Sequence, residues 1–98
     1  MNIQQEKNGN QLTVALEGRL DTMTAPELEA ALKEALDGVE ELTFDLANLE
    51  YISSAGLRVL LAAQKTMNRQ GSMTVKNANE IIMEIFDVTG FADILTIE

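Results

Sequence analysis

Apolar and polar residues alternate along several short segments of this chain, which predicts β-strands with one buried face. In residues 11–17 the large apolar positions are Leu12, Val14 and Leu16, and the residues between them are small or polar. Asn8-Gly9-Asn10 precedes this segment and is typical of a hairpin turn after an earlier strand. The predicted strands cover residues 2–7, 11–17, 42–46 and 72–76, with a last edge strand at 94–97.

A helical period of apolar residues predicts three helices between and after these strands. The first begins at Thr24 as its cap, has Pro26 in its first turn and ends at Gly38. The other two are expected at residues 54–69, where Gly71 stops the helix, and at residues 79–88. This order favours one α/β domain over residues 1–98, with a mostly parallel sheet of four or five strands, an N-terminal hairpin and three or four helices.

The composition removes most catalytic chemistry. The chain has no cysteine and no histidine, so it offers no thiolate nucleophile, no Ser-His-Asp triad and no metal site built on Cys or His. The glycine motifs that cradle phosphates are absent as well. We therefore expect neither an enzyme nor a bound cofactor or metal.

The charge is strongly acidic and unevenly distributed. The net charge is −9; residues 1–50 hold 11 acidic and 3 basic residues, whereas residues 51–98 hold 5 acidic and 4 basic residues. Nucleic-acid binding needs a basic surface, so it is not expected. The N-terminus has no signal-peptide pattern, and no apolar run approaches the roughly 18 residues of a membrane helix. We expect a cytoplasmic protein that does not insert into membranes.

Residues 51–58, with the sequence YISSAGLR, join a predicted strand to the second predicted helix. Ser54 is a candidate cap for the free backbone N–H groups of the first helical turn. The same N–H groups favour a negative group, so Ser54 is also a candidate for phosphorylation. Gly56 costs the helix about 1 kcal/mol relative to alanine, unless a close approach of another element requires it.

One stripe of this helix contains basic residues and no acid. Spacings of three and four residues place its members on one side of the helix: Ser54, Arg58, Ala62, Lys65 and Arg69. One interpretation is a solvated helix face. The other is a partner-binding surface headed by a switchable serine, with Arg58 one turn away and able to reach a phosphate on Ser54.

Several short motifs, in order along nearly the whole chain, resemble the STAS domains of bacterial anti-sigma factor antagonists. They are Gly18-Arg19-Leu20-Asp21, Asp45-Leu46, residues 51–57 and Phe86-Asp87-Val88-Thr89-Gly90-Phe91. The resemblance implies a small α/β domain that binds an anti-sigma factor of the histidine-kinase-like ATPase type and thereby releases a sigma factor. It also implies that this kinase phosphorylates one serine of the antagonist and that a serine phosphatase reverses the modification.

The resemblance assigns roles to individual positions. Ser54 matches the phosphorylated serine, and Asp21 matches an acid near that serine at the partner surface. Ser53 stands where the family commonly has Asp, and it ranks below Ser54 as an acceptor. The expected partner-binding residues are Asp21, Ser53, Ser54, Ala55, Gly56, Leu57 and Arg58.

Two alternatives remain. The first is a STAS docking subunit of another cytoplasmic complex, such as a lipid-transport ATPase, which would use the same helix without phosphorylation. The second is a receiver-type phosphoacceptor in which Asp21 and Asp45 form a metal-binding acidic pair and Lys76 supplies the late lysine.

Overall fold

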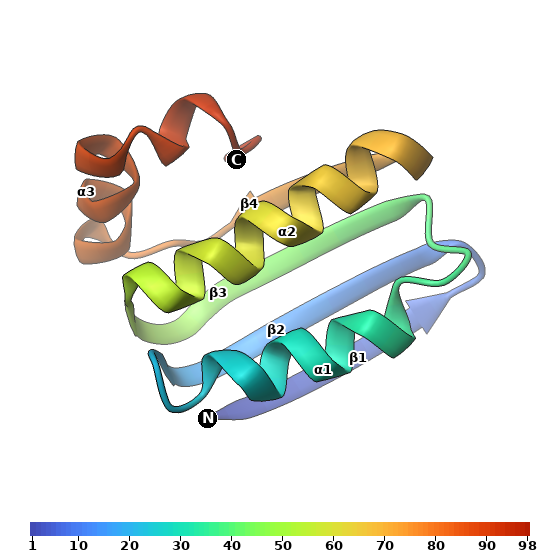
Figure 1. Ribbon diagram of the computed structural model, residues 1–98, viewed down its shortest axis with the longest axis horizontal. Helices are drawn as coiled ribbons and strands as arrows, with labels where there is room; N and C mark the ends of the chain where they lie inside the picture. The colour runs from blue at the N-terminus through green and yellow to red at the C-terminus, as the bar shows by residue number, and fades with distance from the viewer.

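The computed structural model describes all 98 residues, and its helices and strands follow the predicted order. Helices α1 and α2 lie side by side on one face of a four-stranded sheet, and α3 lies beyond α2 at one end of the sheet (Figure 1). The elements are β1 (Asn2–Asn8), β2 (Gln11–Leu20), α1 (Ala25–Ala35), β3 (Glu41–Ile52), α2 (Ser54–Gln70), β4 (Ser72–Lys76), α3 (Glu80–Thr89) and the short 3-10 helix η1 (Phe91–Asp93).

The sheet has the order β1-β2-β3-β4 and is mixed. Strands β1 and β2 form the antiparallel hairpin, and the pairs β2–β3 and β3–β4 are parallel. The parallel connections pass through α1 and α2, which cover the inward side chains of the strands. The predicted α/β fold with an N-terminal hairpin is therefore confirmed, with four strands.

Alternation along the strands decides which side chains enter the core. Val14 and Phe44 are paired in register and are both fully buried under the helices. Thr13 and Asp45 point to the opposite face, which remains partly exposed. Parallel sheets are normally covered on both faces, so this two-layer arrangement leaves an unusually polar sheet surface open to solvent.

The end of the chain differs from the prediction. Residues 94–97 do not form a strand; Ile97 makes only an isolated bridge to Val75. The chain first turns through η1, so it reaches the edge of β4 only at its last residues, with hydrogen bonds from Val75 N to Thr96 O and from Glu98 N to Val75 O. Leu95 is buried and anchors this segment.

Gly71 ends α2 as predicted, although the physical reason is contact and not a left-handed turn. Its φ of 171° is an extended conformation open to any residue. A Cβ atom at this position would lie 1.8 Å from the carbonyl oxygen of Glu40. Only glycine therefore allows the end of α2 to approach the start of β3 this closely.

Candidate partner-binding site at the start of helix α2

The candidate site lies where β2 and β3 leave the sheet. Leu20 and Ile52 are paired at the ends of these strands, and Ser53 N donates a 2.9 Å hydrogen bond to Leu20 O. Asp21 follows the first strand and Ser53 follows the second. The structure thus brings together two segments that the sequence alone could not connect. Strand β2 also continues through Gly18 to Leu20, further than residues 11–17.

Asp21 organises the loop before α1. Its Oδ1 accepts hydrogen bonds from Met23 N at 3.0 Å and Thr24 N at 3.2 Å, and Arg19 Nε lies 3.9 Å from Oδ2. Partial burial raises the pKa of Asp21, but these N–H donors, the Thr24 hydroxyl and Arg19 outweigh it and hold the pKa below its ordinary value. The carboxylate therefore stays ionised at neutral pH and fixes the loop geometry.

Thr24 lies at the predicted cap position of α1, but its side chain does not cap the helix. Its hydroxyl instead donates to Arg19 O at 2.8 Å and accepts from Asp21 N at 2.9 Å. Thr24 therefore ties the loop back to the end of β2.

The predicted cap at Ser54 is also wrong, because Ser53 performs that role. Ser53 has an extended backbone with ψ of 176°, and its Oγ accepts a 3.3 Å hydrogen bond from Gly56 N. Ser54 is the first residue of α2 and its side chain is exposed. The two serines are therefore different: one hydroxyl is engaged in capping, and the other faces solvent beside the helix N-terminus.

Gly56 is explained by the close approach of α2 to the strand ends. A Cβ atom here would lie 2.7 Å from Leu20 Cγ and 2.9 Å from Ile52 Cγ1. Leu20 and Ile52 are both buried in the core. Gly56 therefore allows the first turn of α2 to pack directly on the ends of β2 and β3, and this packing positions Ser54 relative to the sheet.

The expected partner-binding residues differ in accessibility. Ser54 and Arg58 are exposed and Ala55 is half-buried, whereas Gly56 and Leu57 are buried within the domain. Buried members of the set can influence a partner only through the position of the exposed ones.

Two nearby features were missed in the sequence. Arg19 places its guanidinium 4.6 Å from the centre of the Tyr51 ring, a cation–π contact across paired strands. Met23, in the Asp21 loop, has 85% of its side chain exposed. The pairing of β2 with β3 could not be read from the sequence, although a methionine between Thr22 and Thr24 in a polar turn is a sequence signal for an exposed contact residue.

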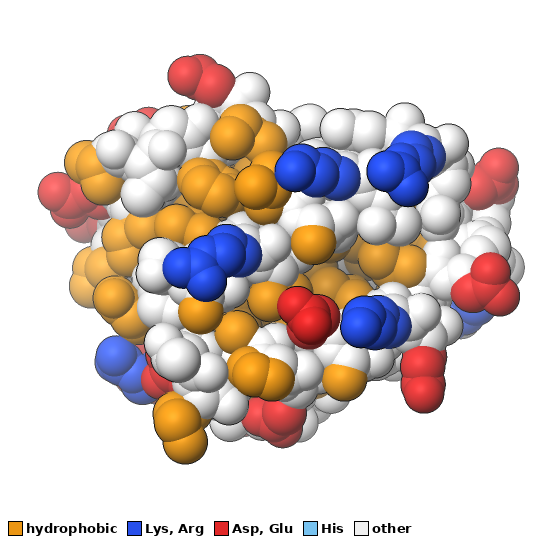
Figure 2. All heavy atoms as spheres, viewed as in Figure 1, with side chains coloured by type: hydrophobic (Ala, Val, Ile, Leu, Met, Phe, Trp, Pro, Cys, Tyr) orange, Lys and Arg blue, Asp and Glu red, His pale blue; other side chains and the backbone are white.

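The basic stripe of α2 is confirmed as an exposed surface. All of its members are exposed: Ser54, Arg58, Ala62, Lys65 and Arg69. Basic side chains follow the course of α2 across the helix-covered face, while acidic side chains are more common around the margin (Figure 2). No acidic residue lies in the first turn of α2, so its N-terminal dipole is not neutralised within the helix.

The structure contradicts an acidic metal site at Asp21 and Asp45. Asp45 is paired with Ala15 of β2, and Asp21 comes six residues after Ala15 along the chain. At the rise of an extended strand this separates Asp21 from Asp45 by roughly 20 Å. Asp45 instead accepts hydrogen bonds from Asn77 Nδ2 at 3.0 Å and Ala47 N at 3.1 Å. No cluster of three or more potential acidic, His or Cys metal ligands occurs in the structure.

Comparisons with known proteins agree with this fold. The family model described as "Mlab, STAS domain" matches residues 3–96. BtrV of Bordetella bronchiseptica, provisionally named an anti-sigma factor antagonist, is 33% identical over 99 residues, covering 99% of this chain and 85% of BtrV. The anti-sigma-B factor antagonist of Bacillus subtilis is 31% identical over 98 residues, covering 99% of this chain and 90% of that protein.

A solved structure of an anti-sigma factor antagonist from Mycobacterium paratuberculosis superposes with a TM-score of 0.88 at 24% identity, covering 98% of this chain and 83% of the other. None of the helices combines the length and the hydropathy needed to cross a membrane. Fold, motif order and full-length similarity lead to one assignment. The chain belongs to the STAS domain family and, within it, to the anti-sigma factor antagonists.

Proposed function

We propose that this protein binds an anti-sigma factor of the histidine-kinase-like ATPase type while Ser54 is unmodified, and that phosphorylation of Ser54 by that partner ends the complex. A serine phosphatase restores the binding form. The binding surface consists of the Asp21 loop and the start of α2, with Ser54 and Arg58 as its exposed centre. The related proteins named anti-sigma factor antagonists support the class of partner.

The observation that carries the proposal is the division of roles between Ser53 and Ser54. The Oγ of Ser53 accepts the hydrogen bond from Gly56 N, so the first turn of α2 keeps its cap when Ser54 is modified. Ser54 projects an exposed hydroxyl from the first position of the helix. A kinase can therefore modify Ser54 without removing a hydrogen bond that stabilises the fold.

Electrostatics explains why the modified domain would stay folded and still lose its partner. A phosphate brings a charge of about −1.5 to −2 at pH 7. The uncompensated N-terminus of α2 and Arg58, one turn away, both favour that charge within the domain. In a packed interface the same phosphate would have to be desolvated or face like charge, which is enough to lower affinity about 100-fold or more.

Ser53 in place of the expected acid bears on the kinase step. The Ser53 hydroxyl is neutral, whereas an Asp at this position would present a negative charge to the active site of the kinase. The substitution therefore predicts a slower phosphorylation than an Asp-Ser sequence would give. Ser53→Asp keeps a capping oxygen, because Asp is as good an N-cap as Ser, and it should raise the rate of modification.

The test uses an anti-sigma kinase of the histidine-kinase-like ATPase type from the same organism. Intact mass after incubation with that kinase and ATP should rise by one phosphate, and Ser54→Ala should abolish the gain while Ser53→Ala retains it. Ser54→Asp should bind the kinase about 100-fold more weakly than the unmodified protein. Equal binding by Ser54→Asp would refute the switch, and loss of the phosphate only in Ser53→Ala would move the acceptor site.

A second function is that of a STAS docking subunit of another complex, and the match to the family model "Mlab, STAS domain" is compatible with it. In that case the same surface docks on a transport ATPase and no phosphorylation occurs. Co-purification with transporter subunits, together with binding that is unchanged in Ser54→Asp, would favour this alternative.

A further inference from the structure

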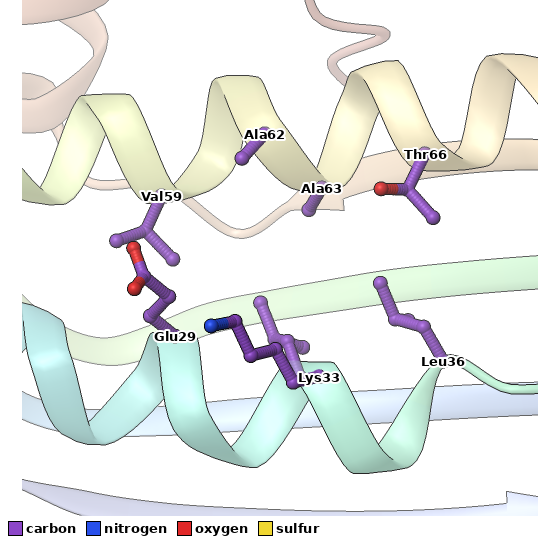
Figure 3. A pocket seen from close by; sticks show the side chains of 8 residues that line it. Glu29, Lys33, Leu36, Val59, Ala62, Ala63 and Thr66 are labelled. Atoms are coloured by element: carbon purple, nitrogen blue, oxygen red, sulfur yellow. The ribbon is translucent and has the colours of Figure 1, made fainter.

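An open groove runs between α1 and α2 on the outer side of the helix layer. It has a volume of about 480 Å³, and Leu32, Leu36, Val59 and Ala63 form its apolar floor (Figure 3). Small residues on α2, namely Ala62, Ala63 and Thr66, leave the space between the helices unfilled. The groove is open along its length, which suits the side chains of a protein element and not an enclosed small molecule.

The rims of the groove carry most of the basic residues on this face. Ala62 belongs both to the groove and to the basic stripe, so the stripe forms the α2 rim, with Arg58 and Lys65 on either side of Ala62. The α1 rim carries Glu29 and Lys33, one helical turn apart (Figure 3). Three basic residues, Lys33, Arg58 and Lys65, against the one acid Glu29 leave the rims with a local excess of positive charge in a chain with a net charge of −9, which favours an acidic occupant.

Helix α3 of the same chain has the complementary properties. Ile81 is 58% exposed and Val88 is 77% exposed, so large apolar side chains stand unpartnered at both ends of the helix. The charged residues of α3 are Glu80, Glu84 and Asp87, all exposed, with no basic residue among them. In its own molecule α3 lies beyond α2, on the side away from α1 (Figure 1). None of the residues that line the groove belongs to α3.

The dimensions of the two surfaces agree. Ile81 and Val88 are seven residues apart and thus on one face of α3, separated by about 10.5 Å along the axis. The groove extends from Glu29 on α1 to Leu36 at its C-cap, and from Val59 to Thr66 on α2, a separation of seven positions on each side. Both apolar ends of α3 can therefore lie over the apolar floor at once, with Glu84 between them and near the basic rims.

From these observations we propose that the α1–α2 groove receives α3 of a second copy of this chain. The contact is a helix-in-groove interface with apolar anchors at Ile81 and Val88 and acidic residues facing Arg58, Lys33 and Lys65. Two copies with a net charge of −9 each repel at long range. At about 0.15 M ionic strength that repulsion is screened beyond about 8 Å, and the local pairing of opposite charges then dominates.

Sedimentation velocity of the full chain at this ionic strength tests the proposal. The wild-type protein should self-associate over ~10 to ~500 µM, the range expected for a weak interface. Ala62→Glu in the groove and Val88→Glu on α3 should each weaken the association by about tenfold or more. Both residues are exposed, so neither change disturbs the core. Met23→Glu, an equally exposed apolar residue outside both surfaces, is the matched control and should associate normally.

Mixing the two defective variants gives the decisive result. The Val88→Glu protein retains an intact groove and the Ala62→Glu protein retains an intact α3, so a 1:1 mixture should regain association as a heterodimer. A monomeric wild type at the highest concentration, or a mixture that stays monomeric, would overturn the proposal. If the wild type is monomeric while Ala62→Glu loses binding to the anti-sigma kinase, the groove holds a helix of that partner instead.

Discussion

Replacing Gly56 with alanine tests the close contact that places Ser54. Two effects oppose each other in this variant. Alanine is more favourable than glycine within a helix by about 1 kcal/mol. The added Cβ would, however, lie 2.7 Å from Leu20 Cγ and 2.9 Å from Ile52 Cγ1, where carbon atoms normally stay about 3.5 Å or more apart.

The steric effect should win. Leu20 and Ile52 are at most 1% exposed and cannot swing into solvent, so α2 or the strand ends must shift by several tenths of an ångström. Overpacking of this kind costs about 1 to 3 kcal/mol. After the gain in helix propensity is subtracted, Gly56→Ala should lower the free energy of unfolding by about 1 kcal/mol, with an upper value near 2 kcal/mol.

Urea unfolding monitored by circular dichroism measures this difference, and a double-mutant cycle identifies its cause. Leu20→Ala removes the nearer of the two obstructing side chains at the cost of a cavity. In that background Ile52 can shift into the vacated space, so Gly56→Ala should cost less than it does in the wild type and the two changes should be non-additive. A Gly56→Ala protein more stable than the wild type, or additive effects in the cycle, would refute the close-approach explanation.

Three further predictions concern single side chains. Ser53→Ala should lower the free energy of unfolding by about 1 kcal/mol because the cap is lost, whereas Ser54→Ala should change it by less than about 0.5 kcal/mol; urea unfolding distinguishes the two. Asp45 has its pKa lowered below 3.8, chiefly by the Asn77 hydrogen bond, so its contribution to stability is present above that pH and disappears as the pH falls through the folded-state pKa. Asp45→Asn should therefore be less stable than the wild type at pH 7, and the two unfolding midpoints should converge in acid. Gln64 is 7% exposed; its Nε2 donates to Asn68 Oδ1 at 2.9 Å, but its Oε1 has no hydrogen-bond partner. Gln64→Met removes the unpaired buried oxygen, and the exposed Asn68 can bond to water instead, so the variant should raise the unfolding free energy by up to about 1 kcal/mol; an unchanged or lowered thermal midpoint would contradict this.

Much of the fold could be predicted because periodicity reports burial directly. The alternation at Leu12, Val14 and Leu16 identified the face of β2 that α1 and α2 cover, and all three residues are buried. The helical spacing in α2 likewise identified its exposed stripe from Ser54 to Arg69. These features depend on the local geometry of one element, which the sequence specifies without knowledge of its neighbours.

The failures arose where a second element decides the outcome. Two adjacent serines are equally good caps by residue type; the structure places Ser53 before the helix, with Gly56 of the first turn packed on the strand ends. Residues 94–97 are mostly apolar and resemble an edge strand, but the chain turns through η1 first and only Ile97 forms a bridge with β4. Receiver chemistry at Asp21 and Asp45 fails for the same reason, because strand register places the two residues far apart.

The separate roles of Ser53 and Ser54 have a consequence for how a cell could use this protein. A switch placed on the capping residue would change the folding equilibrium each time it was set, and one form would be degraded faster than the other. With the cap held on Ser53, both forms should have similar lifetimes. Under the proposed function, the output would then depend on the ratio of kinase to phosphatase activity, while the total amount of the protein stayed constant.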